Sequence, residues 1–197
     1  MEQWDKTAII LVVGSMRSAH GAGFLYALEK EMALPKPDIM IGSSGNAANV
    51  LYHCADQIEE MRRIWLQLLS TPRFISIWRF WRIMNIDYLV DTVFKHQEPL
   101  DVKQVQSTPI EWCIPLTDYD TGKTLYVSAG DDFDPFELLR GAKAIPILFG
   151  KKVRTGHRQY IDGEFGATLQ DHVSHALALG ARRIVIVNHF SGWNWPR

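Results

Sequence analysis

The chain has 197 residues, a length that predicts one domain spanning 1–197, with its core over about 6–190. Its 21 Lys and Arg residues nearly balance 22 Asp and Glu residues. The net charge of −1 argues against nucleic acid as a partner, because nucleic-acid-binding domains are usually markedly basic. Hydrophobic residues make up 47% of the chain and charged residues 22%, which excludes a disordered protein.

The first seventy residues predict two successive strand–turn–helix units. The apolar, β-branched run Thr7–Val13 is typical of a buried parallel strand, and a helix over 21–32 follows it. A second short strand, Asp38–Gly42, is followed by the turn Ser43-Ser44-Gly45 and then by a long helix over 46–69. This succession predicts an α/β fold with a mainly parallel central sheet.

The rest of the chain predicts shorter elements with clear boundaries. Helices are expected over 73–84 and 86–95, and strands over 110–116 and 123–128 bracket a turn-rich loop that suits a β-hairpin. The later elements, in chain order, are a short helix over 134–141 with Asp134 as its N-cap, a strand end at Tyr160-Ile161, a helix that ends near Leu179 before Gly180, and a strand over 183–188.

The segment 61–84 carries five Arg and no acidic residue, although the whole chain is nearly neutral. If 73–84 is helical, five apolar residues share one face of the helix: Phe74, Ile77, Trp78, Trp81 and Met84. Arg residues occupy much of the opposite half of the helix surface. A basic face opposite Trp and Phe is typical of a helix at a membrane surface. The same apolar face also suits packing on the core, or a lid over an active site.

The cysteines and the N-terminal sequence indicate in which cellular compartment the protein is expected. Cys54 and Cys113 have no Cys-x-x-Cys or Cys/His spacing, so neither a disulfide framework nor a zinc site is expected. The N-terminus lacks the pattern of a signal peptide, and no apolar run approaches the roughly 18 residues of a spanning helix. We therefore expect a cytoplasmic protein, with 61–84 as its candidate for peripheral membrane contact.

Three stretches carry candidate chemistry. Ser44 lies where a buried strand turns into a helix, as a nucleophile does in a Gly-x-Ser-x-Gly elbow, although an N-capping serine would also fit. Asp162-Gly163 follows a strand end and is either a catalytic carboxylate or an ordinary turn. The residues Gly14-Ser-Met-Arg17 follow the first strand, where backbone N–H groups could bind an oxyanion or a phosphate. They match neither Gly-x-Gly-x-x-Gly nor a Walker motif.

Together these stretches resemble the patatin-like phospholipase family, along nearly the whole chain. Five motifs occur in the family's order: an oxyanion loop with Arg (Val13-Gly-Ser-Met-Arg17-Ser), an elbow continued by Ala-x-Asn (Gly42-Ser-Ser44-Gly-Asn46-Ala-Ala-Asn49), a hairpin (Thr117-Asp-Tyr-Asp-Thr-Gly122), a helix end (Ala142-Lys-Ala144-Ile-Pro146-Ile-Leu-Phe149) and Asp162-Gly163. Each motif is weak alone, but five in order make the resemblance specific.

The resemblance implies a three-layer α/β/α domain that hydrolyses lipid esters as a serine carboxylic-ester hydrolase, with a Ser–Asp dyad and no cofactor or metal. Carried over by position, Ser44 is the nucleophile and Asp162 the general base. The oxyanion or substrate would bind at Gly14, Ser15, Met16 and Arg17. Support for the elbow would come from Gly42, Gly45, Asn46 and Gly163.

The oxyanion loop and the elbow each depart from the family pattern. The oxyanion loop keeps only Gly14, with Val13, Ser15 and Ser18 at neighbouring positions, and Asn46 stands where the elbow usually has its second glycine. Positive φ angles favour glycine, although Asn also tolerates them. A catalytically degenerate family member that acts as a membrane-surface or scaffold protein is therefore one alternative.

Two further alternatives involve histidine. The order Ser44, Asp162, His189 would suit a Ser–His–Asp triad of an α/β-hydrolase, although His189 also fits an ordinary loop residue. His172-x-x-His175 with Asp171 could place metal ligands on one helix face, but no second cluster supplies the remaining ligands. Two surface histidines are the expected interpretation of that helix.

Overall fold

A computed structural model of the protein describes residues 5–12, 14–79, 83–145, 153–155 and 158–188. Its centre is a seven-stranded sheet of order β5-β6-β3-β2-β1-β7, with β4 also paired to β3. The strands are β1 (Lys6–Val12), β2 (Ile39–Gly42), β3 (Glu111–Asp118), β4 (Thr124–Ser128), β5 (Val153–Thr155), β6 (Arg158–Asp162) and β7 (Ala181–Asn188).

Four strands form the parallel part of the sheet. Strand β1 pairs in parallel with both β2 and β7, and β2 pairs in parallel with β3. Strands β4 and β6 are antiparallel to β3, and β5 is antiparallel to β6. The residues of β2 and most of those of β1 are buried, as a strand covered on both faces requires. The predicted strands and the 117–122 hairpin are confirmed.

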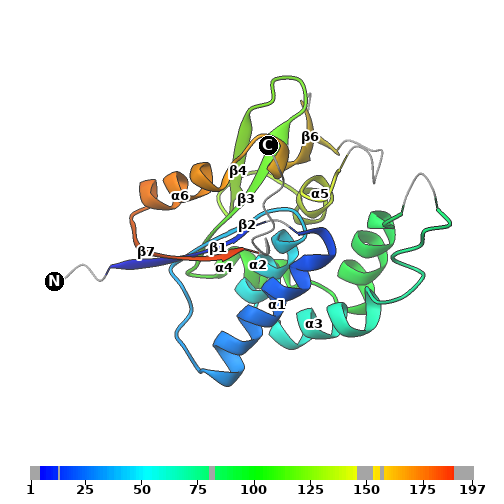
Figure 1. Ribbon diagram of the computed structural model, residues 1–197, viewed down its shortest axis with the longest axis horizontal. Coiled ribbons are helices and arrows are strands. Elements are labelled where there is room, and N and C mark those ends of the chain that lie inside the picture. Colours follow the sequence, from blue (N-terminus) through cyan, green and yellow to red (C-terminus); the bar gives the residue numbers. More distant parts are fainter. Residues whose placement is uncertain (1–4, 13, 80–82, 146–152, 156–157, 189–197) are drawn as a thin grey trace, which may run out of the picture.

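Helices cover both faces of the sheet and complete three layers. Figure 1 shows α1, α2 and α3 on one side and α6 on the other. A large apolar core lies under the first group, and a smaller one packs Ala176 of α6 against β1 and β2. The helices are α1 (Ser18–Tyr26), α2 (Asn46–Cys54), α3 (Ile58–Arg63), α4 (Val102–Ser107), α5 (Pro135–Gly141) and α6 (Leu169–Ala178). The predicted α/β/α architecture is confirmed.

Tighter and wider helical turns extend several of these helices. A 3₁₀ turn, η1 (Ser15–Arg17), leads directly into α1, so that helix begins earlier than the predicted residue 21. π-helical turns continue α1 and α3 as η2 (Ala27–Glu31) and η3 (Ile64–Leu68) and form η4 (Tyr88–Gln97), and a last 3₁₀ turn is η5 (Gly163–Phe165). No helix within the described residues is long and apolar enough to cross a membrane.

Strands β2 and β6 meet end to end along one edge of β3. Cys113 pairs with Ile41 of β2 and with Ser128 of β4, so β2 and β4 occupy opposite edges. Leu116 pairs with β4 and also with Asp162 of β6, so β6 lies on the same edge as β2. Because the two strands run in opposite directions, their carboxyl ends face each other. The topology therefore brings together Ser44, two residues beyond β2, and Asp162, the last residue of β6.

The predicted single helix over 46–69 is wrong, because the chain breaks it at Asp56. That residue has a φ angle of 59°. The N–H of Gln57 bonds to the carbonyl of Tyr52, and the N–H of Asp56 to that of His53. This is a Schellman C-cap with Asp at the position that glycine usually fills. Because the usual glycine is missing, the sequence carries no clear signal for the end of α2. Lys36 forms an ion pair with the Asp56 carboxylate.

The predicted amphipathic helix over 73–84 is also wrong. The chain doubles back there: Ile75 forms an antiparallel bridge with Met84, and Asn85 donates its N–H to the Phe74 carbonyl. We call the described residues of this segment, 75–79 and 83–84, the Trp78 loop; residues 80–82, which include Trp81, lie outside the described part of the chain. Phe74 is buried, whereas Ile77 and Trp78 are 73% and 81% exposed, so these apolar residues do not share one face.

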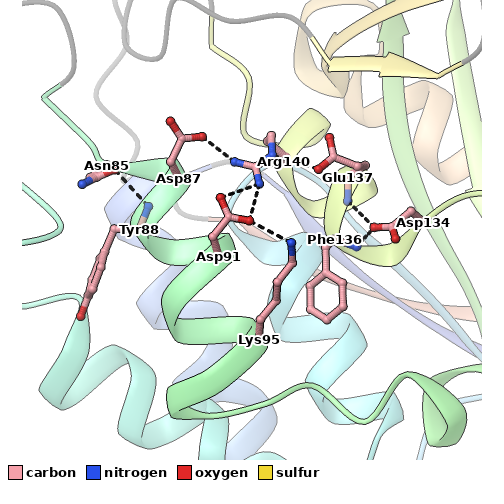
Figure 2. Close-up of polar contacts among 9 residues, drawn as sticks. All are labelled: Asn85, Asp87, Tyr88, Asp91, Lys95, Asp134, Phe136, Glu137 and Arg140. Atoms are coloured by element: carbon pink, nitrogen blue, oxygen red, sulfur yellow. Dashed lines mark hydrogen bonds and ion pairs between the residues drawn. The ribbon is translucent and has the colours of Figure 1, made fainter.

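Helix α5 is tied to η4 by a network of charged groups. The Arg140 guanidinium donates to Asp87 and to both carboxylate oxygens of Asp91, at 2.8 and 2.9 Å for the latter, and Asp91 also accepts from Lys95 (Figure 2). As predicted, Asp134 caps α5 and accepts from two backbone N–H groups. This network holds the C-terminal end of α5, and the chain that follows it, against η4.

Other predicted boundaries are confirmed. Gly180, with a φ angle of 95°, follows the end of α6, and Thr168 and Asp171 form a capping box at its start. Helix α4 has no counterpart among the predicted elements, and Asp101 caps it by accepting from the Gln104 N–H. Cys54 and Cys113 are free thiols inside the protein.

Candidate active site

Ser44 sits on a tight elbow between β2 and α2. Its φ angle is 53°, in the left-handed region, and its side chain is buried. A Cβ at Gly42 would lie 2.5 Å from a methyl carbon of Val50, and one at Gly45 would lie 2.4 Å from the Ser18 Oγ. Glycine is therefore required on both sides of the serine because the neighbouring helices approach closely, and the predicted supporting residues Gly42 and Gly45 lie at the elbow.

Asn46 begins α2 and has ordinary helical surroundings, so its tolerance of left-handed geometry is not used. Its side chain is fully buried and its Oδ1 accepts a hydrogen bond of 3.0 Å from Asn49. Gly21 of α1 makes the room for it: a Cβ at position 21 would lie 2.2 Å from that Oδ1. The loss of the usual glycine at 46 is thus compensated by a glycine on a neighbouring helix.

The loop over 14–18 packs against this elbow. Ser15 carries the positive φ angle of the loop, 44°, while Gly14 is extended. Because Ser15 and Met16 begin a helical turn, their backbone N–H groups have no partner inside that turn. Asn49 anchors the loop from α2, since its Nδ2 donates to the Ser18 carbonyl at 2.8 Å, and its Oδ1 accepts from Trp65. The loop and the elbow therefore form one rigid unit.

Arg17 lies differently from the rest of that loop. Its side chain is exposed and is not part of the pocket lining, and its backbone N–H donates to the Gly14 carbonyl at 2.6 Å. Of the four predicted loop residues, Ser15 and Met16 line the pocket beside Ser44. Val13 lies outside the described residues.

Asp162 ends β6 and is only 2% exposed. The Ser44 side chain interacts with its carboxylate and favours the ionised form, and the carboxylate accepts the Glu164 N–H at 3.1 Å. The Thr117 hydroxyl donates to the Asp162 carbonyl at 2.9 Å, and a Cβ at Gly163 would lie 2.4 Å from the Pro115 carbonyl oxygen. Strand β3 of the hairpin thus fixes the backbone of Asp162 and Gly163, and with it the position of the carboxylate.

Burial sets the proton affinity of this carboxylate. Removal from water raises the pKa of Asp162 to about 6, against the opposing effects of the Ser44 and Glu164 hydrogen bonds. A carboxylate with a raised pKa is a stronger base, yet it is still mostly ionised at neutral pH. The Ser44–Asp162 pair can therefore move a proton from the hydroxyl to the carboxylate.

Lys143 is a site residue that the sequence interpretation assigned no role. It lies just beyond α5, is 7% exposed, and lines the same pocket as Ser44. Burial lowers the pKa of its ammonium group to about 7, and the negative charge of Asp162 acts in the opposite direction. A signal was present in the sequence: one charged residue interrupts the otherwise apolar run 141–149.

The pocket beside Ser44 has a volume of about 530 Å³, part of which is open to solvent. Apart from Ser15, Ser44, Asn49 and Lys143, its walls are almost entirely apolar. The apolar and aromatic lining residues come from α2, α3, η3, η4, the Trp78 loop and the stretch between η3 and that loop: Ala48, Tyr52, Met61, Ile64, Trp65, Leu69, Phe74, Met84, Leu89 and Phe94. A long aliphatic group fits such walls better than a polar one.

The two histidines of α6 are not surface residues held ready for a metal. His172 is fully buried and its Nδ1 lies 2.7 Å from the Tyr126 hydroxyl, while His175 stacks on the Tyr126 ring at 3.9 Å between centroids. The expectation of two surface histidines is therefore wrong for His172. Within the described part of the chain, no group of three or more candidate metal ligands occurs. His189 lies outside the described residues.

Comparisons with known proteins agree with this architecture. The crystal structure of VipD from Legionella pneumophila is similar to this chain, with a TM-score of 0.62 and 9% sequence identity. The match covers 92% of this chain and 49% of VipD, so this chain spans about half of that protein's length. At this identity the likeness shows a shared fold. No curated protein matches the sequence. A family model described as patatin-like phospholipase matches residues 14–169, most of the chain, and the chain therefore belongs to the patatin-like phospholipase family.

Proposed function

We propose that this protein hydrolyses ester bonds of lipids through an acyl-enzyme formed on Ser44. The observation that carries the proposal is the position of the buried Asp162 carboxylate next to Ser44, where β2 and β6 meet along one edge of β3, beside an apolar pocket. The family's description as phospholipases supports lipid acyl hydrolysis in general.

In this mechanism Asp162 takes the hydroxyl proton while the Ser44 Oγ attacks the carbonyl carbon of the ester. The negative charge that develops on the carbonyl oxygen is stabilised by backbone N–H groups of Ser15 and Met16, which line the pocket. Asp162 then returns the proton to the leaving alcohol, and an acyl group remains on Ser44. A water molecule, deprotonated by the same carboxylate, then attacks the acyl carbon, and as the fatty acid leaves the proton returns from Asp162 to the Ser44 oxygen. The chemistry requires no cofactor.

The apolar pocket points to a long acyl chain as the part of the substrate that binds beside Ser44. Its walls offer almost no hydrogen-bonding groups, and burial of apolar surface is the main source of affinity that they supply. We therefore infer that turnover increases with acyl length across a series of p-nitrophenyl esters until the pocket is filled.

The decisive test is labelling with a fluorophosphonate, which reacts covalently with activated serine hydroxyls. We expect labelling of the wild type that is lost in Ser44→Ala and reduced at least about 100-fold in Asp162→Asn. Ser43→Ala is the matched control, because Ser43 is the adjacent buried serine, and its hydroxyl contacts the Leu11 carbonyl at 3.4 Å instead of Asp162. Folded wild type that takes up no label would instead favour a catalytically degenerate membrane-surface or scaffold protein.

We further propose peripheral contact with a membrane through the Trp78 loop. The exposed tip, Ile77 and Trp78, and the pocket residues Phe74 and Met84 belong to one continuous segment. The Arg79 guanidinium braces this segment by donating to the Phe74 carbonyl at 2.8 Å. An amphipathic Trp beside exposed Arg73 suits the interface of a bilayer, and its position would bring the apolar pocket to the lipid.

A further inference from the structure

A buried cation lies beside the proposed dyad. Lys143 follows α5, is 7% exposed, and lines the pocket together with Ser44. Its Nζ lies 3.5 Å from the Leu139 carbonyl oxygen, a long contact, and 5.7 Å from the centroid of the Phe94 ring. These neighbours only partly replace the water that an ammonium group loses on burial. Such a charge is retained at a cost in stability, and an opposite charge nearby reduces that cost.

The opposite charge that acts on Lys143 is the carboxylate of Asp162. The backbone holds the two residues together, because the N–H of Asp162 donates to the carbonyl of Ala144 at 3.2 Å. The nearest basic neighbour in sequence is otherwise engaged: Arg140 bonds to Asp87, Asp91 and Glu137 on the outer side of α5 (Figure 2). Lys143 is therefore placed to act on Asp162, and Arg140 is not.

A second acid opposes this effect. Glu164, two residues beyond Asp162, disfavours ionisation of the Asp162 carboxylate through its charge. The same Glu164 lies 3.5 Å from the Nε2 of buried His172. Burial and the negative charge of Glu164 therefore favour the protonated form of Asp162. The buried Lys143 cation, the Ser44 side chain and the Glu164 N–H favour its ionised form.

We propose that Lys143 is a positioning residue that keeps Asp162 ionised, so that this carboxylate can accept the Ser44 proton. The inference rests on the proposed function, because it assigns Asp162 the role of base. Lys143 acts through Asp162: the Ser44 side chain interacts with the carboxylate, and the carboxylate takes the proton. Burial shifts both pKa values toward the neutral forms, and the interaction between the two charges opposes that shift in each group, because each charge favours the ionised form of the other.

The first test is the pH dependence of fluorophosphonate labelling. Lys143→Met keeps the length of the side chain and removes its charge. We expect its labelling rate to fall at least about threefold below wild type at about pH 5.5 and to approach wild type at about pH 8.5, because without the cation Asp162 ionises only at higher pH. Lys143→Arg, which keeps the positive charge, should restore the wild-type labelling rate at about pH 5.5. Lys103→Met, on an exposed position of α4, is the charge-matched control and should follow the wild type.

The outcomes separate this inference from a loss of pocket shape. A uniform fall in rate at every pH would overturn the inference, because it would mean that Lys143 acts through packing. A profile identical to wild type would overturn it as well.

A second measurement is independent of activity. Urea unfolding of wild type, Lys143→Met, Asp162→Asn and the double variant forms a double-mutant cycle. We expect Lys143→Met to raise the unfolding midpoint more in the Asp162→Asn background than in wild type at about pH 7, and equally in both at about pH 4, where Asp162 is protonated. Equal effects at both pH values would overturn the inference. If the wild type takes up no label but the cycle shows coupling, the proposed function fails while the electrostatic pairing stands.

Discussion

At the scale of single residues, the site shows how burial makes a base and also destabilises the fold. Asp162 is 2% exposed and its pKa is raised to about 6, so the folded protein binds a proton at this position more tightly than the unfolded chain does. Stability therefore falls as pH rises from about 4 to about 6, and the loss persists above that range. An ionised carboxylate in this position therefore costs stability at neutral pH, a cost that the proposed role of Asp162 as a base would account for.

Asp162→Asn should consequently stabilise the protein while removing its activity. The expected gain in free energy of unfolding at neutral pH is on the order of 2 kcal/mol, and no gain is expected at about pH 4. Urea unfolding across this range measures it. Asp171→Asn is a control of opposite sign: the Thr168 capping box lowers the pKa of Asp171, so this carboxylate stabilises the fold above about pH 4 and its loss should weaken the fold there. A less stable Asp162→Asn at neutral pH would contradict the argument.

A second residue-scale prediction concerns the two glycines of α1. Gly21→Ala should destabilise the protein by about 1–3 kcal/mol, because the new Cβ would meet the Asn46 Oδ1 at 2.2 Å. Gly23, two residues along the same helix, has no atom within 4 Å of its virtual Cβ, and Gly23→Ala should stabilise by about 0.5–1 kcal/mol. Thermal unfolding compares the two. Adding Asn46→Ala to the Gly21→Ala variant should recover part of the loss, and no recovery would show that the contact is not its cause.

At the scale of elements, the site depends on how strands and helices are joined rather than on any one of them. Strand β3 pairs with β2 and β6 on one edge, and this shared edge brings Ser44 to Asp162. Helix α5 then carries Lys143 to the same place, and the Arg140 network holds α5 against η4 (Figure 2). The position of Lys143 is thus determined by an ion-pair network one helical turn away.

Arg140→Met should therefore loosen α5 and the segment after it. The Arg140 side chain is largely buried while its partners are partly exposed, so we expect a loss of about 1–2 kcal/mol in stability. Hydrogen exchange should quicken over 135–145. Arg63→Met is the matched control: Arg63 also contacts two carboxylates, those of Glu60 and Glu98, but its side chain is 39% exposed. Arg63→Met should lose less stability and should leave hydrogen exchange over 135–145 unchanged. Equal exchange rates in the two variants would contradict the conclusion that Arg140 holds this segment in place.

At the scale of the whole molecule, one face of the sheet carries the pocket beside Ser44. The helices α1, α2 and α3 and the turns η3 and η4 build the apolar core and the pocket on this face, and α6 closes the opposite face (Figure 1). Ile77 and Trp78 of the Trp78 loop are exposed, and Met84 of the same loop lines the pocket. The proposed active site and the proposed membrane contact therefore belong to the same face.

Replacing Ile77 and Trp78 by Ser should weaken binding to lipid vesicles roughly tenfold while leaving hydrolysis of a short soluble ester unchanged. The loss corresponds to removing two exposed apolar side chains from a bilayer interface. Co-sedimentation with phosphatidylcholine vesicles, with and without phosphatidylserine, measures it. Leu177→Ser is the control, because Leu177 is exposed on α6 at the opposite face. Equal binding of both variants would exclude the Trp78 loop as the contact.

Local signals predicted the parts of this protein whose conformation depends on neighbouring residues. The strands, the hairpin, the Asp134 cap and the Gly180 helix end follow from β-branched runs, capping side chains and a glycine with positive φ. The errors arose where tertiary contacts overrode the local pattern. Asp56 ended a helix without glycine, and the apolar residues of 73–84 were divided between a pocket wall and a solvent-exposed tip.

The sequence by itself determined the fold class, the family and the residues of the elbow, since all three follow from short motifs and their order. Only the tertiary structure decided what these residues can do together. Ser44 and Asp162 meet because β2 and β6 share one edge of β3, and Asp162 is a stronger base because the surrounding chain excludes water from it. Lys143 became part of the site for the same reason: desolvation and charge coupling arise from packing between distant segments, and no local sequence pattern encodes them.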